Sequence, residues 1–142
     1  HPECPERLSS VLKGLDQSVF SGLTRESAPR ASEIEIGRAH PGAYLRRLQA
    51  AVPAQGLRQT DGDTVISSGS GEAMVLAAGA VIRAVDAVAA GEADNAFCAV
   101  RPPGHHAESD QALAPSGNAA PTITSSMYPL RQAAGVMYFA GR

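Results

Sequence analysis

The chain has 142 residues, a net charge of −2 and an isoelectric point near 6.1, and its length is sufficient for one domain with a hydrophobic core. Its arginines do not form the basic cluster that nucleic-acid binding needs, and Arg46, Arg47 and Arg58 are better explained as part of a solvated helix face. Neither Cys4 nor Cys98 belongs to a CxxC pair, so the sequence predicts neither a structural zinc site nor a disulfide framework.

These properties also predict where the protein resides. A chain without a disulfide framework is expected in the reducing cytoplasm. We find no signal-peptide pattern, and the weakly polar segment 73–82 is too short to span a bilayer. Because the first residue is His1 rather than methionine, we expect the chain to start inside a longer protein.

The first part of the chain is predicted to be helical. In the segment CPERLSSVLKGL, Pro5 suits a first helical turn, and Leu8, Val11, Leu12 and Leu15 form one apolar stripe. Gly22 is a plausible stop for the segment that begins with this helix.

Two further helices are expected before residue 53. Ser32 followed by Glu35 matches a capping box, and the His40–Pro41 pair should interrupt the helix that this box begins. The segment GAYLRRLQAAV should form the next helix, with an inner face made of Tyr44, Leu45, Leu48 and Val52.

The second half of the chain alternates between loop, helix and strand. Residues 53–72 are rich in Gly, Ser and Asp and are predicted to be a loop, whereas 72–91 should form a long helix that ends at Gly91. The apolar run 95–100 is typical of a parallel strand buried on both faces. Beyond Asp110 we predict only one strand, at 135–141.

The segment RPPGHH, residues 101–106, is the strongest candidate for chemistry. Its two prolines stiffen the chain, and its glycine permits a tight turn, so His105 and His106 leave the end of the predicted strand in a defined direction. An imidazole can accept a proton from water and return it to a leaving group. The residues alone are equally compatible with two solvated histidines on a surface loop.

Several segments in the expected order resemble the histone deacetylase family, which has the arginase/deacetylase fold. RPPGHHAE is similar to the double-histidine motif of that family, HPECPERL to its opening segment, and AHPGAYLRRL to its His-Ser-x-x-Tyr-Leu stretch. The stretch 61–100 is similar to the region before the double histidine in bacterial and class II members. The resemblance covers residues 1 to about 110.

The resemblance implies hydrolysis of acetyl-lysine, acetylated polyamines or related N-acetyl amides by a water bound to zinc. By the same resemblance, His106 would be the general base and acid, and His105 would hydrogen-bond the water and tune its charge. Arg7 would line an internal channel, and either Asp61 or Asp63 would contact the substrate backbone, although a turn-forming role also explains an aspartate there.

The resemblance stops near Asp110. The family continues with a Gly-Phe-Cys segment, an Asp-x-His ligand pair, a further aspartate and a tyrosine that polarises the carbonyl, and residues 111–142 contain no Asp, Glu, His or Cys at all. A catalytic zinc usually takes three protein ligands, so we expect this chain to bind no zinc. The upstream residues that could replace the missing ligands are His1, His40, Asp61, Asp63, His105, His106, Glu108 and Asp110.

We therefore divide the chain into a deacetylase-like region, residues 1–110, and a divergent tail, residues 111–142. The expected fold is α/β, the N-terminal part of a three-layer α/β/α sandwich with a mostly parallel sheet. Three explanations stay open: part of a deacetylase that is inactive alone, a non-enzymatic binding or oligomerisation module, or a stand-alone hydrolase. Because half of a fold leaves sheet edges and helix faces uncovered, we expect a homo-oligomer.

Overall fold

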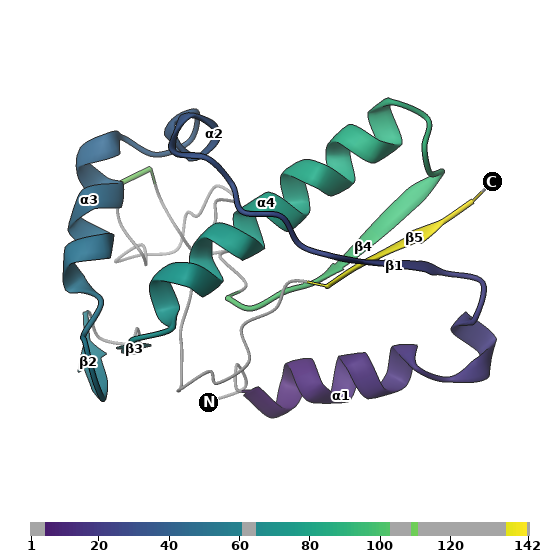
Figure 1. Ribbon diagram of the computed structural model, residues 1–142, viewed down its shortest axis with the longest axis horizontal. Coiled ribbons are helices and arrows are strands. Elements are labelled where there is room, and N and C mark those ends of the chain that lie inside the picture. The colour runs from purple at the N-terminus through teal and green to yellow at the C-terminus, as the bar shows by residue number, and fades with distance from the viewer. Residues whose placement is uncertain (1–4, 61–64, 103–108, 111–135, 142) are drawn as a thin grey trace, which may run out of the picture.

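The computed structural model describes residues 5–60, 65–102, 109–110 and 136–141, and Figure 1 shows the arrangement of their helices and strands. The elements in chain order are α1 (Pro5–Leu15), a 3₁₀ turn (Ser18–Phe20), β1 (Thr24–Ser27), α2 (Glu33–Gly37), α3 (Gly42–Ala51), β2 (Leu57–Gln59), β3 (Val65–Ser67), α4 (Ser70–Ala89), β4 (Asn95–Ala99) and β5 (Val136–Ala140). Within the described ranges, no helix is both long enough and apolar enough to cross a membrane.

A three-stranded sheet in the order β1-β5-β4 forms the centre of the fold. The last strand lies between the other two and is antiparallel to both, so that Tyr138 stands opposite Arg25 on one side and Phe97 on the other. The pairing therefore differs from the mostly parallel sheet that the sequence predicts. Strands β1 and β4 run in the same direction, but the returning strand β5 separates them.

The apolar run 95–100 forms β4, but its apolar composition predicts the wrong surroundings for this strand. A parallel strand inside an α/β sheet is covered on both faces. In the structure, the side chain of Phe97 is 52% exposed, and the strand alternates between exposed and more buried positions. The composition of the run predicts the strand correctly, but it does not predict its neighbours.

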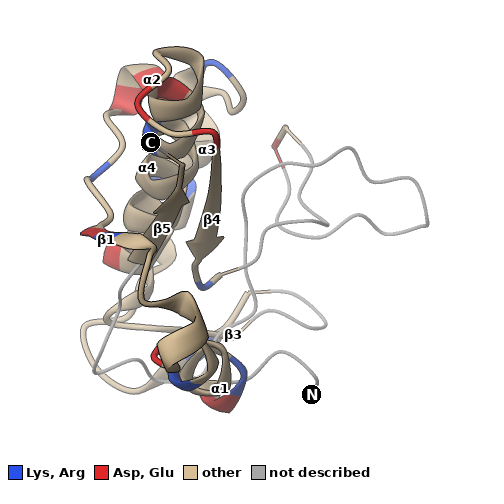
Figure 2. Cartoon of the chain, turned by 90° about the vertical axis from the view of Figure 1, so that its right-hand side faces the viewer, with Lys and Arg blue, Asp and Glu red and all other residues tan. Residues whose placement is uncertain are grey.

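Helices cover the sheet on two sides, and the side chains of β5 divide between these two faces. Successive residues of a strand point to opposite faces. Met137 and Phe139 accordingly belong to the hydrophobic cluster under α4, whereas Tyr138 belongs to the cluster that includes Leu8 of α1. In both Figure 1 and Figure 2 the strands lie between α1 and α4. This arrangement confirms the predicted α/β fold with three layers.

Local signals gave the correct helices in the first part of the chain. Helix α1 begins at Pro5, and the predicted stripe of Leu8, Val11, Leu12 and Leu15 packs together with Tyr138 and Ala99 of the sheet. Helix α2 begins with the predicted capping box, in which the Ser32 hydroxyl accepts from the backbone N–H of Glu35 and the Glu35 carboxylate accepts from that of Ser32. Pro41 then precedes α3 as expected.

Helix α4 packs closely because its buried face is built from small residues, among them Ala77, Ala80 and Ala84. A side chain at Gly79 would collide with the backbone of residues 29–31, since a Cβ atom there would lie 2.8 Å from the nitrogen of Ala31. The helix ends just before Gly91, which has a φ of +70°.

The predicted loop 53–72 contains two short strands that the sequence does not predict. Strands β2 and β3 form a short antiparallel pair in which Leu57 stands opposite Ser67. All three residues of β2 are exposed, so this strand lacks the apolar alternation by which a strand is recognised. The turn after β3 is held by Ser70, whose hydroxyl accepts from the backbone N–H of Ser67 at 2.6 Å.

Candidate functional site

The predicted site residues fall partly outside the described part of the chain. His105, His106, Asp61 and Asp63 belong to ranges that the structure does not describe, so their predicted roles stay predictions. The structure does describe the residues on both sides of the double histidine, at 100–102 and at 109–110. These flanking residues define the candidate site.

Arg7, which belongs to α1, contacts the chain just before the RPPGHH segment. Its Nη2 donates a hydrogen bond to the backbone oxygen of Val100 at 3.0 Å. Val100 directly follows β4, so a side chain from α1 is attached to the chain just before the RPPGHH segment. The structure thus places Arg7 beside Val100, immediately before the RPPGHH segment, and its role in a channel stays a prediction.

Arg101 is the next residue and is unusually buried for an arginine, with 1% of its surface exposed. A guanidinium group is always charged in proteins, and a buried charge is costly unless polar groups surround it. Arg101 does make at least one further interaction within the fold. Pro102 is fully buried as well, so the RPPGHH segment begins in the interior of the protein.

The other end of the loop is attached to the segment around α3. The Nδ1 atom of His40 donates to the backbone oxygen of Ser109 at 2.8 Å, and the Nη2 atom of Arg47 donates to that of Asp110 at 3.1 Å. Three side chains far away in the sequence therefore hold both ends of the segment that carries the double histidine. Such bonds fix where a loop leaves and rejoins the fold.

The contacts of His40 and Arg47 with the backbone of residues 109–110 are not predicted from the sequence. The sequence suggests His40 only as a substitute metal ligand and Arg47 only as part of a solvated helix face. Both lie in the segment AHPGAYLRRL, whose resemblance to the family was the available signal. That signal identifies a segment, but it does not show that the segment binds the backbone of residues 109–110.

The charges and titratable groups of the described residues do not form a second reactive centre. Burial raises the pKa of the Cys98 thiol, which disfavours the thiolate that a nucleophile requires. Among the described residues, no group of three or more His, Cys, Asp or Glu side chains is placed to hold a metal ion. Figure 2 shows basic and acidic residues side by side on α1, while β4 and β5 carry mostly uncharged residues.

Comparison with known proteins identifies the family. The model of the histone deacetylase domain matches residues 1–114. A histone deacetylase-like amidohydrolase of Pseudomonas aeruginosa is 46% identical over 116 residues, which cover 79% of this chain and 29% of that protein. The polyamine deacetylase HDAC10 of Mus musculus is 36% identical, with 75% of this chain and 17% of that protein covered.

A solved structure agrees with these relatives. The HDA15 HD domain superimposes with a TM-score of 0.70 at 28% identity, and the match covers 80% of this chain and 33% of that one. The fold of this chain thus corresponds to part of a histone deacetylase domain. The chain belongs to the histone deacetylase family, and it spans less than a third of the length of the relatives described above.

Proposed function

We propose that this chain is the N-terminal portion of a zinc-dependent deacylase that hydrolyses acetyl-lysine or related N-acetyl amides, and that it is not competent alone. The observation that carries this proposal is the family match over residues 1–114, which includes the double histidine. The amidohydrolase and the polyamine deacetylase among its relatives support an acetylated amine as the substrate.

The histidines would perform the proton transfers of amide hydrolysis. The neutral imidazole of His106 accepts a proton as water attacks the carbonyl carbon, and the resulting imidazolium returns a proton to the amine as the carbon–nitrogen bond breaks. His105 hydrogen-bonds the attacking water, and Asp61 or Asp63 holds the substrate backbone. Arg7, His40 and Arg47 act as positioning residues, because they bind the backbone on both sides of the histidines.

The residues of this chain do not fit a catalytic zinc centre. Zinc in the family would supply the acidified water and polarise the carbonyl. No possible metal ligand follows Asp110 in the sequence, and the described residues hold no ligand cluster. We therefore assign no metal-dependent step to this chain alone.

A chimaeric enzyme separates the two parts of the proposal. Residues 1–110 of this chain would replace the matching segment of the Pseudomonas aeruginosa amidohydrolase, and hydrolysis of a fluorogenic acetyl-lysine amide would be measured. We expect an active chimaera that loses on the order of 100-fold or more activity with His106→Ala, while the exposed substitution Lys13→Ala leaves it unchanged.

The unmodified chain is the second arm of this experiment. We expect no hydrolysis and well below one zinc ion per chain by elemental analysis. A folded but inactive chimaera would contradict the assignment of deacylase machinery to residues 1–110. Stoichiometric zinc together with His106-dependent activity in the unmodified chain would contradict the proposed lack of competence.

One observation favours an additional role in self-association, the alternative of a binding or oligomerisation module. Helix α4 is buried against the sheet on one side, yet Val81, Val85 and Val88 are exposed at successive turns of its outer side. An exposed apolar stripe of this kind is typically covered by another protein surface. We propose that a second copy of the chain covers it, so that the protein is a homo-oligomer.

A further inference from the structure

Helix α4 carries an apolar stripe along its outer side, and only the first half of this stripe is covered by another helix. The residues of the stripe recur at alternating intervals of three and four positions, which places them on one side of the helix. They are Gly71, Met74, Ala78, Val81, Val85 and Val88. Alternating intervals of three and four are the spacing by which two helices pack side by side.

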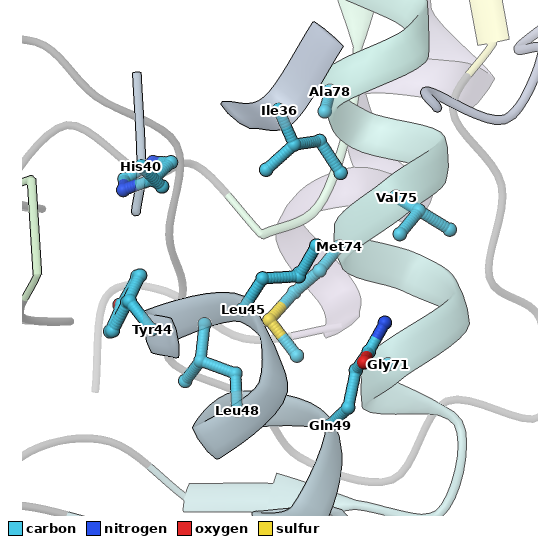
Figure 3. Close-up of a pocket in the computed structure, with 10 residues that line it drawn as sticks. All are labelled: Ile36, His40, Tyr44, Leu45, Leu48, Gln49, Gly71, Met74, Val75 and Ala78. Carbon is cyan, nitrogen blue, oxygen red and sulfur yellow. The ribbon is translucent and has the colours of Figure 1, made fainter. Parts of the chain in front are cut away.

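Helix α3 covers the first half of the stripe. The two helices line one small cavity, to which α4 contributes Gly71, Met74 and Ala78 and α3 contributes Leu45 and Leu48. Figure 3 shows Leu45 and Met74 in the space between the two helices. Because α3 has 10 residues and α4 has 20, α3 is about 15 Å long and α4 about 30 Å. The last turns of α4 therefore extend beyond α3, as Figure 1 shows.

The uncovered half of the stripe is apolar and carries no charge. Its residues are 42%, 61% and 40% exposed, in the order Val81, Val85 and Val88. The nearby cation, Arg83, lies off the stripe and forms ion pairs with Glu26 and Glu92. Two copies of a charged surface would repel each other, whereas two copies of this stripe can pack together as the self-complementary patch that a twofold dimer requires.

The position of α3 determines the direction in which two such helices can pair. In a parallel pair, the α3 helices of both copies would lie at the same end. Each is about 10 Å across, so together they would hold the two α4 helices apart. In an antiparallel pair the α3 helices lie at opposite ends. Because α3 covers the stripe as far as Ala78, only the last turns of α4 can overlap, and Val85 of one copy then faces Val88 of the other.

We propose that the last turns of α4 pair antiparallel with the same turns of a second copy of the chain, with Val85 facing Val88 of that copy. This inference rests on the self-association proposed above. It adds the direction and the register of the contact, which are determined by where α3 ends on the stripe.

Disulfide formation between single cysteines tests this arrangement on the full chain. The variants Val85→Cys and Val88→Cys are made in a background with Cys4→Ser and Cys98→Ser, and each is oxidised alone and mixed with the other. A disulfide needs its two Cα atoms within about 7 Å of each other. We therefore expect the mixture to give at least about fivefold more covalent dimer than either variant alone. Val19→Cys, which is 77% exposed but lies outside α4, is the control and should give no covalent dimer with either variant.

Sedimentation equilibrium of the same samples separates this inference from the proposed self-association. Equal cross-linking of each variant alone and of the mixture would overturn the antiparallel register. An oligomer that forms no covalent dimer through either cysteine would overturn the contact through α4 but leave the self-association standing. A monomeric background protein would overturn both.

Discussion

Single side chains that bind distant backbone define the candidate site. Arg7, His40 and Arg47 each donate to a backbone oxygen on one side or the other of the double histidine. The two histidines can be predicted as site residues from the sequence, because they belong to one contiguous motif. The three attachments are not contiguous with it, so only the folded chain reveals them.

Arg7 provides the first prediction at the residue scale. Arg7→Met keeps most of the apolar stem but removes the donor to Val100, so we expect the free energy of unfolding to fall by roughly 1 kcal/mol. Urea denaturation followed by circular dichroism measures this change. Lys13→Met on the exposed side of the same helix is the control and should stay within about 0.5 kcal/mol of the unmodified protein. Equal losses in both variants would show that the bond to Val100 contributes nothing.

The capping box of α2 provides a prediction about pH. Hydrogen bonds from the side chain and backbone of Ser32 lower the pKa of Glu35 below its ordinary value of 4.5. A carboxyl group whose pKa is lower in the folded state stabilises the protein above its ordinary pKa, and this stabilisation is lost as the pH falls through the lowered value.

The variant Glu35→Gln lacks this titration. Between neutral pH and about pH 3, it should therefore lose less stability than the unmodified protein. Thermal unfolding at a series of pH values measures the difference. Glu33→Gln, which takes no part in the capping box, should retain the pH dependence of the unmodified protein. Identical curves for Glu35→Gln and the unmodified protein would refute the assigned cause.

At the scale of elements, the sequence predicts where helices begin and end, but it does not predict which strands are neighbours in the sheet. Pro5, the Ser32–Glu35 box, Pro41 and Gly91 each act within one or two turns, and the helices begin and end near them. The sequence also predicts a strand at 135–141, which forms β5, but it does not predict the place of β5 between β1 and β4. Strand neighbours depend on contacts between residues far apart in sequence, and the short pair β2 and β3 has too few residues for a pattern.

Gly79 supplies the prediction at this scale. Gly79→Ala improves helix propensity, but its Cβ would collide with the backbone at Pro29 and Ala31, which cannot move as a flexible side chain would. We expect a net loss of about 2 kcal/mol or more in the free energy of unfolding.

Gly14→Ala in α1 is the matched control, because no atom lies within 4 Å of the Cβ position there. This variant should be as stable as the unmodified protein or up to about 1 kcal/mol more stable. Denaturant unfolding of the two variants decides the matter. If Gly79→Ala were also stabilising, α4 would not be packed directly against residues 29–31.

At the scale of the whole molecule, the outer side of α4 should control association. Sedimentation equilibrium at micromolar concentration should show an oligomer for the unmodified protein. Val85→Glu places a charge in the centre of the exposed stripe, where Val85 is 61% exposed, and should shift the population to monomers. Val19→Glu, at a position that is 77% exposed but lies outside α4, should leave the oligomer intact. A monomeric unmodified protein would contradict the proposal.

The central position of β5 determines when the protein can fold during its synthesis. The ribosome makes β1 and β4 early, but β1 pairs only with β5 within the described sheet, and β5 comes from residues 136–140. Thr24 pairs with Phe139, so closing this ladder has to bring together segments from opposite ends of the chain. The sheet can therefore be completed only after β5 has left the exit tunnel. Until then the apolar side chains of α1 and α4 that pack on β5 stay uncovered, and apolar surface exposed in this way favours aggregation of an incomplete chain.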